Sequence, residues 1–298
     1  MGGKSCAAYL KKMKKLLIVC TLFVGLFDQK SIAQEFNEND KSYLKIATRY
    51  YSDVVYSGRR DSVRVPYIEP SLSYFHESGF FVTAALAFNP ISKLKEPFDR
   101  FTFETGYEFS LLKDLNAGIY YAKYKYNTNS EAISSDLKSD IGFDLNYTKN
   151  HWLLSGGGYL FFSGVTDKFS YLSLAYSQEI KIGNGEMKLF ILPKISSNQG
   201  TQKFVNNRAV RRIRQTTTTA VTSNNFNVLN YEAGLELNLA HPKWGITLES
   251  FYAMPVNPAL IASNRRTGDK YEKLSNTFYT QFSVYLKLTN AKHAPTKI

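Results

Sequence analysis

The chain has 298 residues, of which 44% are hydrophobic, and 37 basic against 25 acidic residues give it a formal net charge of +12. Its two cysteines, Cys6 and Cys20, lie near the N-terminus, so a disulfide framework is excluded for the rest of the chain. The mean hydropathy is -0.28. No apolar run reaches the ~20 residues of a membrane-spanning helix, which excludes a bundle of such helices.

Residues 1–33 have the features of a signal peptide. Two lysines after Met13 precede the apolar run Leu16–Phe27, and a polar stretch then ends at Ala33, where cleavage is expected. The run is too short to cross a bilayer, which takes about 20 residues, and a buried helix or a membrane anchor is the alternative. We expect translation to start at Met13 and residues 34–46 to form a polar periplasmic leader.

Between about residues 47 and 289, roughly twelve segments of about ten residues carry an apolar side chain at every second position. The first is predicted near Ala47–Ser57. The clearest covers residues 278–288, where apolar residues such as Phe282 alternate with polar ones such as Gln281. In a strand these two sets lie on opposite faces, whereas a helix would mix them. The pattern therefore predicts strands with one apolar and one polar face.

The segments that connect these strands alternate in length. We expect long connections at residues 58–64, 89–99, 127–135, 164–168, 196–225 and 255–273, and tight turns at residues 76–78, 113–114, 149–150, 183–185 and 240–242. A soluble antiparallel sandwich also has alternating faces, but it gives no reason for loop length to alternate. Outer-membrane barrels have short turns at the periplasmic rim and longer loops at the other.

Both kinds of alternation predict one all-β domain, a closed antiparallel transmembrane β-barrel of about 12 strands over residues 47–289. An even number of strands places both termini on one side, here the periplasmic side, and residues 290–298 form a C-terminal tail. Ten or fourteen strands are the alternatives. No second domain is indicated.

If the apolar faces contact lipid, the opposite faces carry charged side chains into the lumen. The expected lumen charges are Glu104, Glu108, Lys123, Lys125, Asp136, Lys138, Asp140, Asp144, Glu179, Lys181, Lys188, Lys194, Glu232, Glu236, Glu249 and Lys287. The interior of about eight strands is filled by side chains, so twelve strands lie at the margin between a filled and a conducting interior. These residues can form structural ion pairs or line a path for solutes.

The connection of residues 196–225 is basic and contains no acidic residue. The candidate surface anion-binding residues are Arg208, Arg211, Arg212 and Arg214, joined by Lys203 in the same connection, Arg59, Arg60 and Arg64 in the first loop, and Arg265 and Arg266 in the last. The planar guanidinium matches phosphate oxygens, so lipopolysaccharide phosphates are the leading ligand. Anionic solutes gathered at a channel mouth, or no ligand at all, are the alternatives. No aromatic residues interleave these arginines, so nucleic acid is not an expected partner.

No set of residues predicts an enzyme. The four histidines, His76, His151, His241 and His293, are expected in or beside periplasmic turns or in the tail, so neither a metal site nor a cofactor is predicted. His76-Glu77-Ser78 faintly resembles the His-x-Ser motif of outer-membrane phospholipase, also a twelve-stranded barrel. In that family the pair lies on a lipid-facing strand with an asparagine partner, whereas here a tight turn is expected. A lipid hydrolase is the weakest hypothesis.

The whole mature chain resembles Gram-negative outer-membrane β-barrel proteins in its export signal at Ala33-Gln34, its alternating strands and its alternating loops. The resemblance implies a bacterial outer-membrane location and insertion by the barrel-assembly machinery, which in that family recognises a last strand with a terminal aromatic residue. Here the last strand stops near Leu288 and residues 289–298 follow. We expect a narrow, porin-like passive channel for small solutes. The alternative is a non-conducting structural or surface-binding barrel whose basic outer loops contact lipopolysaccharide or an anionic partner.

Overall fold

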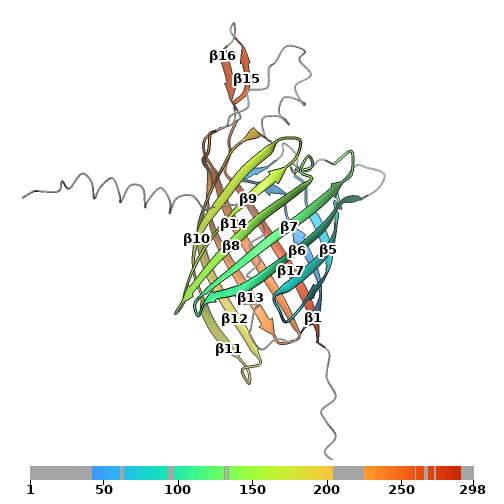
Figure 1. The fold of residues 1–298 in the computed structure, drawn as a ribbon, viewed down its shortest axis with the longest axis vertical. Coiled ribbons are helices and arrows are strands. Elements are labelled where there is room, and N and C mark those ends of the chain that lie inside the picture. The colour runs from blue at the N-terminus through green and yellow to red at the C-terminus, as the bar shows by residue number, and fades with distance from the viewer. Residues whose placement is uncertain are drawn as a thin grey trace, which may run out of the picture.

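Twelve strands in the described part of the chain close into a single antiparallel barrel (Figure 1). The computed structural model describes residues 42–60, 64–92, 97–130, 132, 134–203, 225–258, 260–264, 268–271 and 273–289. In order around the wall, the barrel strands are β1 (Tyr43–Tyr51), β4 (Tyr67–Phe75), β5 (Phe80–Phe88), β6 (Phe98–Leu112), β7 (Leu115–Tyr126), β8 (Ser139–Lys149), β9 (Trp152–Phe162), β10 (Thr166–Tyr176), β12 (Met187–Gly200), β13 (Asn227–His241), β14 (Trp244–Pro255) and β17 (Thr277–Thr289). The remaining strands are β11 (Gln178–Ile182), which pairs with β12 beyond the end of β10, and two hairpins in the loops, β2 (Val55–Tyr56) with β3 (Arg59–Arg60) and β15 (Leu260–Asn264) with β16 (Gly268–Tyr271).

The barrel closes between its first and last strands. β1 pairs with β17, from Tyr43 opposite Thr289 to Tyr51 opposite Gln281, and with β4 on its other side. β10 pairs with both β9 and β12. Every barrel strand therefore has two hydrogen-bonded neighbours. In hydrocarbon no water can satisfy a free strand edge, so this closure is what allows a sheet to span a membrane.

The two rims of the barrel differ in their connections. Tyr43 and Thr289 are partners, so the described ends of the chain lie at one rim, together with the tight turns at residues 76–79, 113–114, 150–151, 183–186 and 242–243. This end is the short-turn rim. The opposite end, the long-loop rim, carries the connections of residues 52–66, 89–97, 127–138, 163–165, 201–226 and 256–276. Only the connection at 163–165 departs from the expected alternation, because it is as short as a turn.

Side chains alternate between the outer wall and the interior. On β17, Phe282, Val284 and Leu286 are exposed on the outside. Gln281 and Ser283 of the same strand line the interior. A closed barrel with an apolar outer wall and a polar interior is the fold of outer-membrane β-barrels, and it implies a bacterial outer-membrane location. The predicted closed antiparallel barrel of 12 strands is thus confirmed.

The first strand differs from the prediction. It covers Tyr43–Tyr51, whereas the sequence predicted residues 47–57. Neither face of the predicted range 47–57 is consistently apolar, whereas Leu44 and Ile46, which precede that range, are exposed on the outer face of the observed strand. Val55 and Tyr56, which read as its continuation, lie in the loop hairpin instead.

The proposed signal peptide, residues 34–41 of the leader and the tail at residues 290–298 lie outside the described residues. Among the residues that are described, no helix is long and apolar enough to cross a membrane.

Inward-facing glycines are covered by aromatic rings of neighbouring strands. Gly142 of β8 is opposite Tyr159 of β9, and Gly234 of β13 is opposite Phe251 of β14. A Cβ atom added to Gly142 would lie 2.0 Å from Cδ1 of the Tyr159 ring. One added to Gly234 would lie 2.6 Å from the Phe251 ring. The missing side chain lets each ring lie across the neighbouring backbone, so the ring takes less room in the lumen.

Gly142→Ala should lower the free energy of unfolding by about 1–3 kcal/mol, because the added methyl group overlaps a buried ring. That ring cannot easily move, since its hydroxyl donates a 2.7 Å hydrogen bond to Asp144. The control is Gly158→Ala on β9, where the nearest atom, on Phe143, would be 3.1 Å away. The unfolding midpoints of both variants are measured in urea, with the heat-modifiable gel shift as the signal of the folded barrel. Equal unfolding midpoints would contradict the role of the ring and glycine pair.

Candidate functional site in the barrel interior

The first loop, residues 52–66, folds across the mouth of the barrel at the long-loop rim. Its hairpin brings Tyr56 against Phe161 of β9, with 6.3 Å between the ring centroids. β9 is the sixth strand from β1 in either direction around the wall, so the hairpin reaches the opposite side. Gly58 at its tip packs on β13, where an added Cβ would lie 2.8 Å from Cβ of Asn230. The loop therefore narrows the mouth.

Arg59 fastens the hairpin on the far side of the mouth. Its side chain is 3% exposed, and its Nη2 donates to the carbonyl oxygens of Val256 and Asn257 at 3.3 and 3.2 Å. Its Nη1 donates to the carbonyl oxygen of Ser57 at 3.2 Å. Ser57 and Gly58 have φ values of +50° and +72°, as in the two-residue turns of tight hairpins. The arginine thus links the turn to the connection that follows β14.

The base of the loop is tied to β17 and to itself. The backbone N–H of Ser52 donates to the carbonyl oxygen of Thr280 at 2.9 Å, and the Thr280 N–H donates to Ser52 Oγ at 2.8 Å. The Asp53 carboxylate accepts from the backbone N–H of Val65 at 2.9 Å. Val65 is buried in an apolar cluster with Tyr67. Hydrogen bonds therefore hold both ends of the loop as well as its tip.

Tyr56 carries no charge into the mouth. Burial raises the pKa of its hydroxyl above the ordinary value, and the nearby carboxylate of Asp167 raises it further. The Arg59 guanidinium acts in the opposite direction without offsetting them. The ring can therefore pack on Phe161 as a neutral group.

Beneath the hairpin, the lumen contains a cavity of about 300 Å³. Its lining extends from Lys45 and Tyr285, on the side of the short-turn rim, to Tyr56 of the hairpin. Residues from eleven of the twelve barrel strands contribute to this lining. The cavity is therefore the interior of the barrel itself and not a pocket in one part of the wall.

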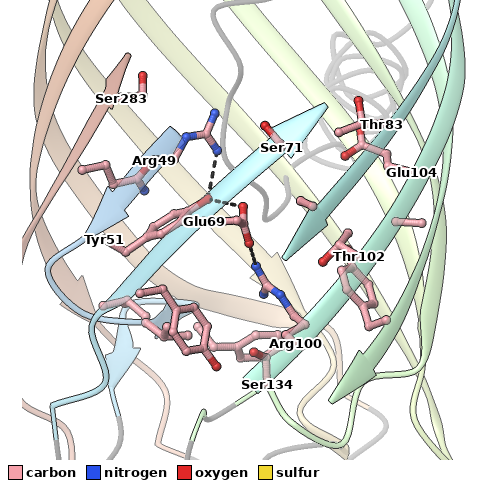
Figure 2. Close-up of a pocket in the computed structure, with 18 of the residues that line it drawn as sticks. Arg49, Tyr51, Glu69, Ser71, Thr83, Arg100, Thr102, Glu104, Ser134 and Ser283 are labelled. Atoms are coloured by element: carbon pink, nitrogen blue, oxygen red, sulfur yellow. Dashed lines mark hydrogen bonds and ion pairs between the residues drawn. The ribbon is translucent and has the colours of Figure 1, made fainter. Parts of the chain in front are cut away.

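A chain of polar contacts joins β1 to β6 along one side of the cavity (Figure 2). Arg49 Nη1 donates to the hydroxyl of Tyr51 at 2.9 Å, and that hydroxyl donates to Oε1 of Glu69 at 3.2 Å. The second oxygen of Glu69 forms an ion pair with Arg100. The chain brings four side chains from three strands into one connected network.

Three tyrosine rings surround Arg100 on the same wall. Its guanidinium carbon lies 5.5 Å from the ring centroid of Tyr67, 5.9 Å from that of Tyr124 and 5.7 Å from that of Tyr126. Cation–π contacts of this kind add to the ion pair with Glu69. Arg100 is therefore held against the wall, and its charge is largely neutralised there.

Carboxylates and tyrosines face the cavity together on β6 to β9. Tyr124 donates to Asp140 at 2.7 Å, and Tyr159 donates to Asp144 at 2.7 Å. Glu104 of β6 lines the cavity beside them. The hydroxyl donors fix the direction of the two aspartates, so this wall presents carboxyl groups in set positions.

Acidic residues outnumber basic ones in the described lining of the cavity. The seven acidic residues are Asp53, Glu69, Glu104, Asp140, Asp144, Glu232 and Glu249, and the four basic residues are Lys45, Arg49, Arg100 and Lys194. This balance is opposite in sign to the formal net charge of +12 for the chain. The basic excess of the protein therefore lies outside the cavity.

The structure places most of the expected lumen charges in the interior. Glu104, Asp140, Asp144, Lys194, Glu232 and Glu249 line the cavity. Glu108 and Glu236 are buried in β6 and β13. Lys188 forms an ion pair with Glu179 at 3.2 Å, and Lys287 lies over an aromatic ring of β1. What these residues do in transport stays a prediction.

Other expected lumen charges lie elsewhere. Lys123 and Lys125 of β7 are exposed and alternate with tyrosines that line the cavity, so they face outward and their placement in the lumen was wrong. The cause is that, near the end of this strand, tyrosines lie on one face and lysines on the other. Both are amphipathic, so the pattern does not show which face points into the barrel. Asp136 and Lys138 precede β8 and are not among the cavity-lining residues, nor is Lys181, which is exposed on β11.

Two of the loop arginines, Arg59 and Arg64, bind main-chain carbonyl groups, which was not expected. Arg59 binds main-chain carbonyl groups, and Arg64 donates to the Ser52 carbonyl oxygen at 2.6 Å. Lys203 is described but is not in the cavity lining. The anion-binding candidates Arg208, Arg211, Arg212 and Arg214 lie outside the described residues, as do Arg265 and Arg266. An anion site formed by them stays a prediction.

The sequence did not single out the network of Tyr51, Glu69 and Arg100, nor the hairpin at the mouth. The hairpin had one local signal, the Ser57-Gly58 pair between two short extended segments. The network had none, because its members lie on three strands and meet only in the closed barrel.

Three histidines, His76, His151 and His241, lie at the short-turn rim, and His293 is outside the described residues. Within the described part of the chain, no group of three or more histidine, cysteine, aspartate or glutamate side chains is arranged to hold a metal ion. His76 Nδ1 lies 2.8 Å from Oγ of Ser78 and accepts from the Ser78 backbone N–H at 3.2 Å. Contacts from both atoms to one ring nitrogen close the turn.

No protein-family model and no curated protein matches the chain. Among solved structures it is similar to an outer membrane channel from Pseudomonas putida F1, at 11% identity and a TM-score of 0.48, over 88% of this chain and 100% of that one. It is also similar to the KdgM porin, at 8% identity and a TM-score of 0.44, over 82% of this chain and 99% of that one. Its similarity to the NanC porin has an identity of 10% and a TM-score of 0.43, and it covers 82% of this chain and 100% of that one. At these identities and TM-scores the similarities carry no argument about function.

Arg59→Ala should loosen the hairpin, because each hydrogen bond from a charged donor contributes about 1.5–3 kcal/mol. In a background with Cys6 and Cys20 replaced by serine, Ser57→Cys reports the exposure of the tip to a water-soluble maleimide. Labelling should be at least about tenfold faster when Arg59 is alanine, since tenfold corresponds to roughly 1.4 kcal/mol.

The matched control for this experiment is Arg64→Ala. It removes the same charge from the same loop, but Arg64 bonds to Ser52 within the loop and not to the opposite wall. Equal acceleration by both substitutions would show that Arg59 does not hold the tip.

Proposed function

We propose that this protein is a narrow passive channel of the bacterial outer membrane for small solutes. The observation that carries the proposal is the cavity, lined mainly by polar and charged residues, that eleven of the twelve strands enclose. A barrel that served only as a scaffold would gain stability from an apolar, close-packed interior. Here serine, threonine, tyrosine and charged side chains surround open volume instead.

The hairpin of the first loop is the evidence that the proposed channel is narrow. It crosses the mouth and is held at its base by Ser52, at its tip by Arg59 and on its side by Tyr56. Solutes that pass the long-loop rim must pass this segment. The non-conducting barrel is the second candidate, because the same contacts would also suit a sealed mouth.

The orientation of the barrel belongs to the same proposal. Longer loops at one rim and tight turns at the other support a long-loop rim that faces outward and termini in the periplasm. Export by the signal peptide at residues 1–33 and insertion by the barrel-assembly machinery would deliver the chain to this position. We propose no catalytic activity, since the contact of His76 with Ser78 serves the turn.

Channel activity is tested by reconstituting the folded chain in planar bilayers, where discrete conductance steps are expected. Replacing residues 53–65 with a short glycine-serine linker should raise the conductance step, because the segment that crosses the mouth is removed. Tyr56→Ala combined with Arg59→Ala is a milder variant that keeps the length of the loop and should act in the same direction.

The control for conductance is removal of residues 260–271, which carry the β15–β16 hairpin at the same rim. In Figure 1 this hairpin stands clear of the barrel, so its loss should leave the step unchanged. Folding of each variant is checked by the heat-modifiable gel shift. Absence of conductance from folded wild type and from both hairpin variants would overturn the channel and leave the non-conducting barrel.

The charge of the cavity lining specifies the kind of solute. Seven acidic against four basic residues give the passage a negative interior, although the chain as a whole is basic. Clefts lined by one sign of charge concentrate the opposite ions, because the low-dielectric walls focus the field. The channel should therefore prefer cations to anions.

Cation preference is measured from the reversal potential in a potassium chloride gradient, where we expect permeability to potassium to exceed that to chloride at least about threefold. Glu104→Gln with Glu249→Gln should bring the ratio towards one, and high salt should do the same by screening. The matched control is Glu77→Gln, an exposed carboxylate in the turn after β4. A ratio below one for wild type would show that the lining does not set selectivity.

A further inference from the structure

Two lysines of β7 lie on the outer wall of the barrel. Tyr120, Ala122 and Tyr124 of this strand line the cavity, so the residues between them face outward. Lys123 and Lys125 occupy two such outward positions, and both are exposed. They are therefore on the side of the wall that contacts lipid.

Their height on the wall follows from the order of the outward residues. From the middle of β7 towards the long-loop rim these are Ile119, Tyr121, Lys123 and Lys125. The sequence passes from apolar through amphipathic to charged side chains. A lysine on the lipid-facing wall costs about 2–4 kcal/mol at the bilayer midplane but about 0–1 near the interface. The pair therefore lies at the level of the lipid headgroups.

The neighbouring strand remains apolar at this height. Lys123 is directly opposite Phe103 of β6, and Lys125 is opposite Phe101. Both phenylalanines are exposed on the outer wall, at 39% and 36%. Two positive groups thus lie beside an aromatic surface, which is the combination that matches a lipid with a charged headgroup and apolar tails.

The charges around the pair favour an anion. The described acidic residues of β6 and β8 are Asp99, Glu104, Glu108, Asp140 and Asp144, all partly or fully buried, and β7 has none. On the other side, the residue of β8 opposite Lys123 is the uncharged Ser139. The outer surface here carries the two lysines, while Glu104, Asp140 and Asp144 of the neighbouring strands line the cavity.

We infer that Lys123 and Lys125 bind the phosphate group of a membrane lipid, whose acyl chain lies along Phe101 and Phe103. Residues two apart on one face of a strand are separated by roughly 6.6 Å, so two flexible ammonium groups can reach one phosphate. The alkyl stems of the lysines lie along the wall while their charges reach the headgroup level. This lipid site is independent of conduction through the barrel.

The test measures binding of short-chain phosphatidic acid to the folded, detergent-solubilised full chain, with retention read by native mass spectrometry. Diacylglycerol of the same chain length lacks only the phosphate, and inorganic phosphate lacks only the chains. Wild type should bind phosphatidic acid at least about tenfold more tightly than Lys123→Gln with Lys125→Gln, a difference of roughly 1.4 kcal/mol. Phe103→Ala should weaken binding of the lipid but not of inorganic phosphate.

The matched control is Lys113→Gln with Lys149→Gln, which removes two exposed lysines from the short-turn rim. It should bind phosphatidic acid like the wild type. Equal binding by wild type and the Lys123 and Lys125 variant would overturn the inference, and so would an equal loss in the control. Equal affinity for diacylglycerol, or full competition by inorganic phosphate at equal concentration, would likewise rule out a phospholipid as the ligand.

Discussion

Closure of the sheet between β1 and β17 is the constraint on which the rest of the molecule depends. A backbone group without a partner in hydrocarbon costs several kcal/mol, so each strand must have two neighbours. Once the ring is closed, strand pleat assigns every side chain to lipid or to lumen. The narrow lumen then has to accommodate rings, and glycines such as Gly142 opposite Tyr159 provide the room. Architecture, polarity and free interior volume are thus linked through one set of hydrogen bonds.

The barrel separates charges that the composition mixes. Acids gather in the interior, where Asp140 and Asp144 are held by tyrosine hydroxyls, while β7 places lysines on the outside of the same wall. A single sheet therefore carries an excess of acidic residues on its inner face and exposed lysines on its outer face. The overall charge of a barrel is consequently a poor guide to what it passes, because the charge is shared between two surfaces that never meet the same ligand.

The sequence alone predicted a strand and the direction of its side chains where the two faces of the strand differ strongly. Residues 278–288 were predicted correctly because apolar residues alternate there with serine, glutamine and lysine. It was insufficient at β1 and β7, where tyrosines face inward and the contrast between the faces disappears, so Lys123 was placed on the wrong side. The contacts that hold the hairpin at the mouth could not be predicted. These contacts, Tyr56 with Phe161 and Arg59 with Val256, join residues that are far apart in the sequence, and no local pattern encodes them.

The loop across the mouth also has a bearing on how the chain assembles. It follows the first strand, yet its partners Asn230, Val256 and Thr280 belong to the last three strands and the connection between them. A segment near the beginning of the fold is therefore secured only after the end of the chain is in place. Until β1 pairs with β17 the sheet is open, and the loop has no complete set of partners. Closure of the barrel therefore also fixes the segment that narrows its mouth.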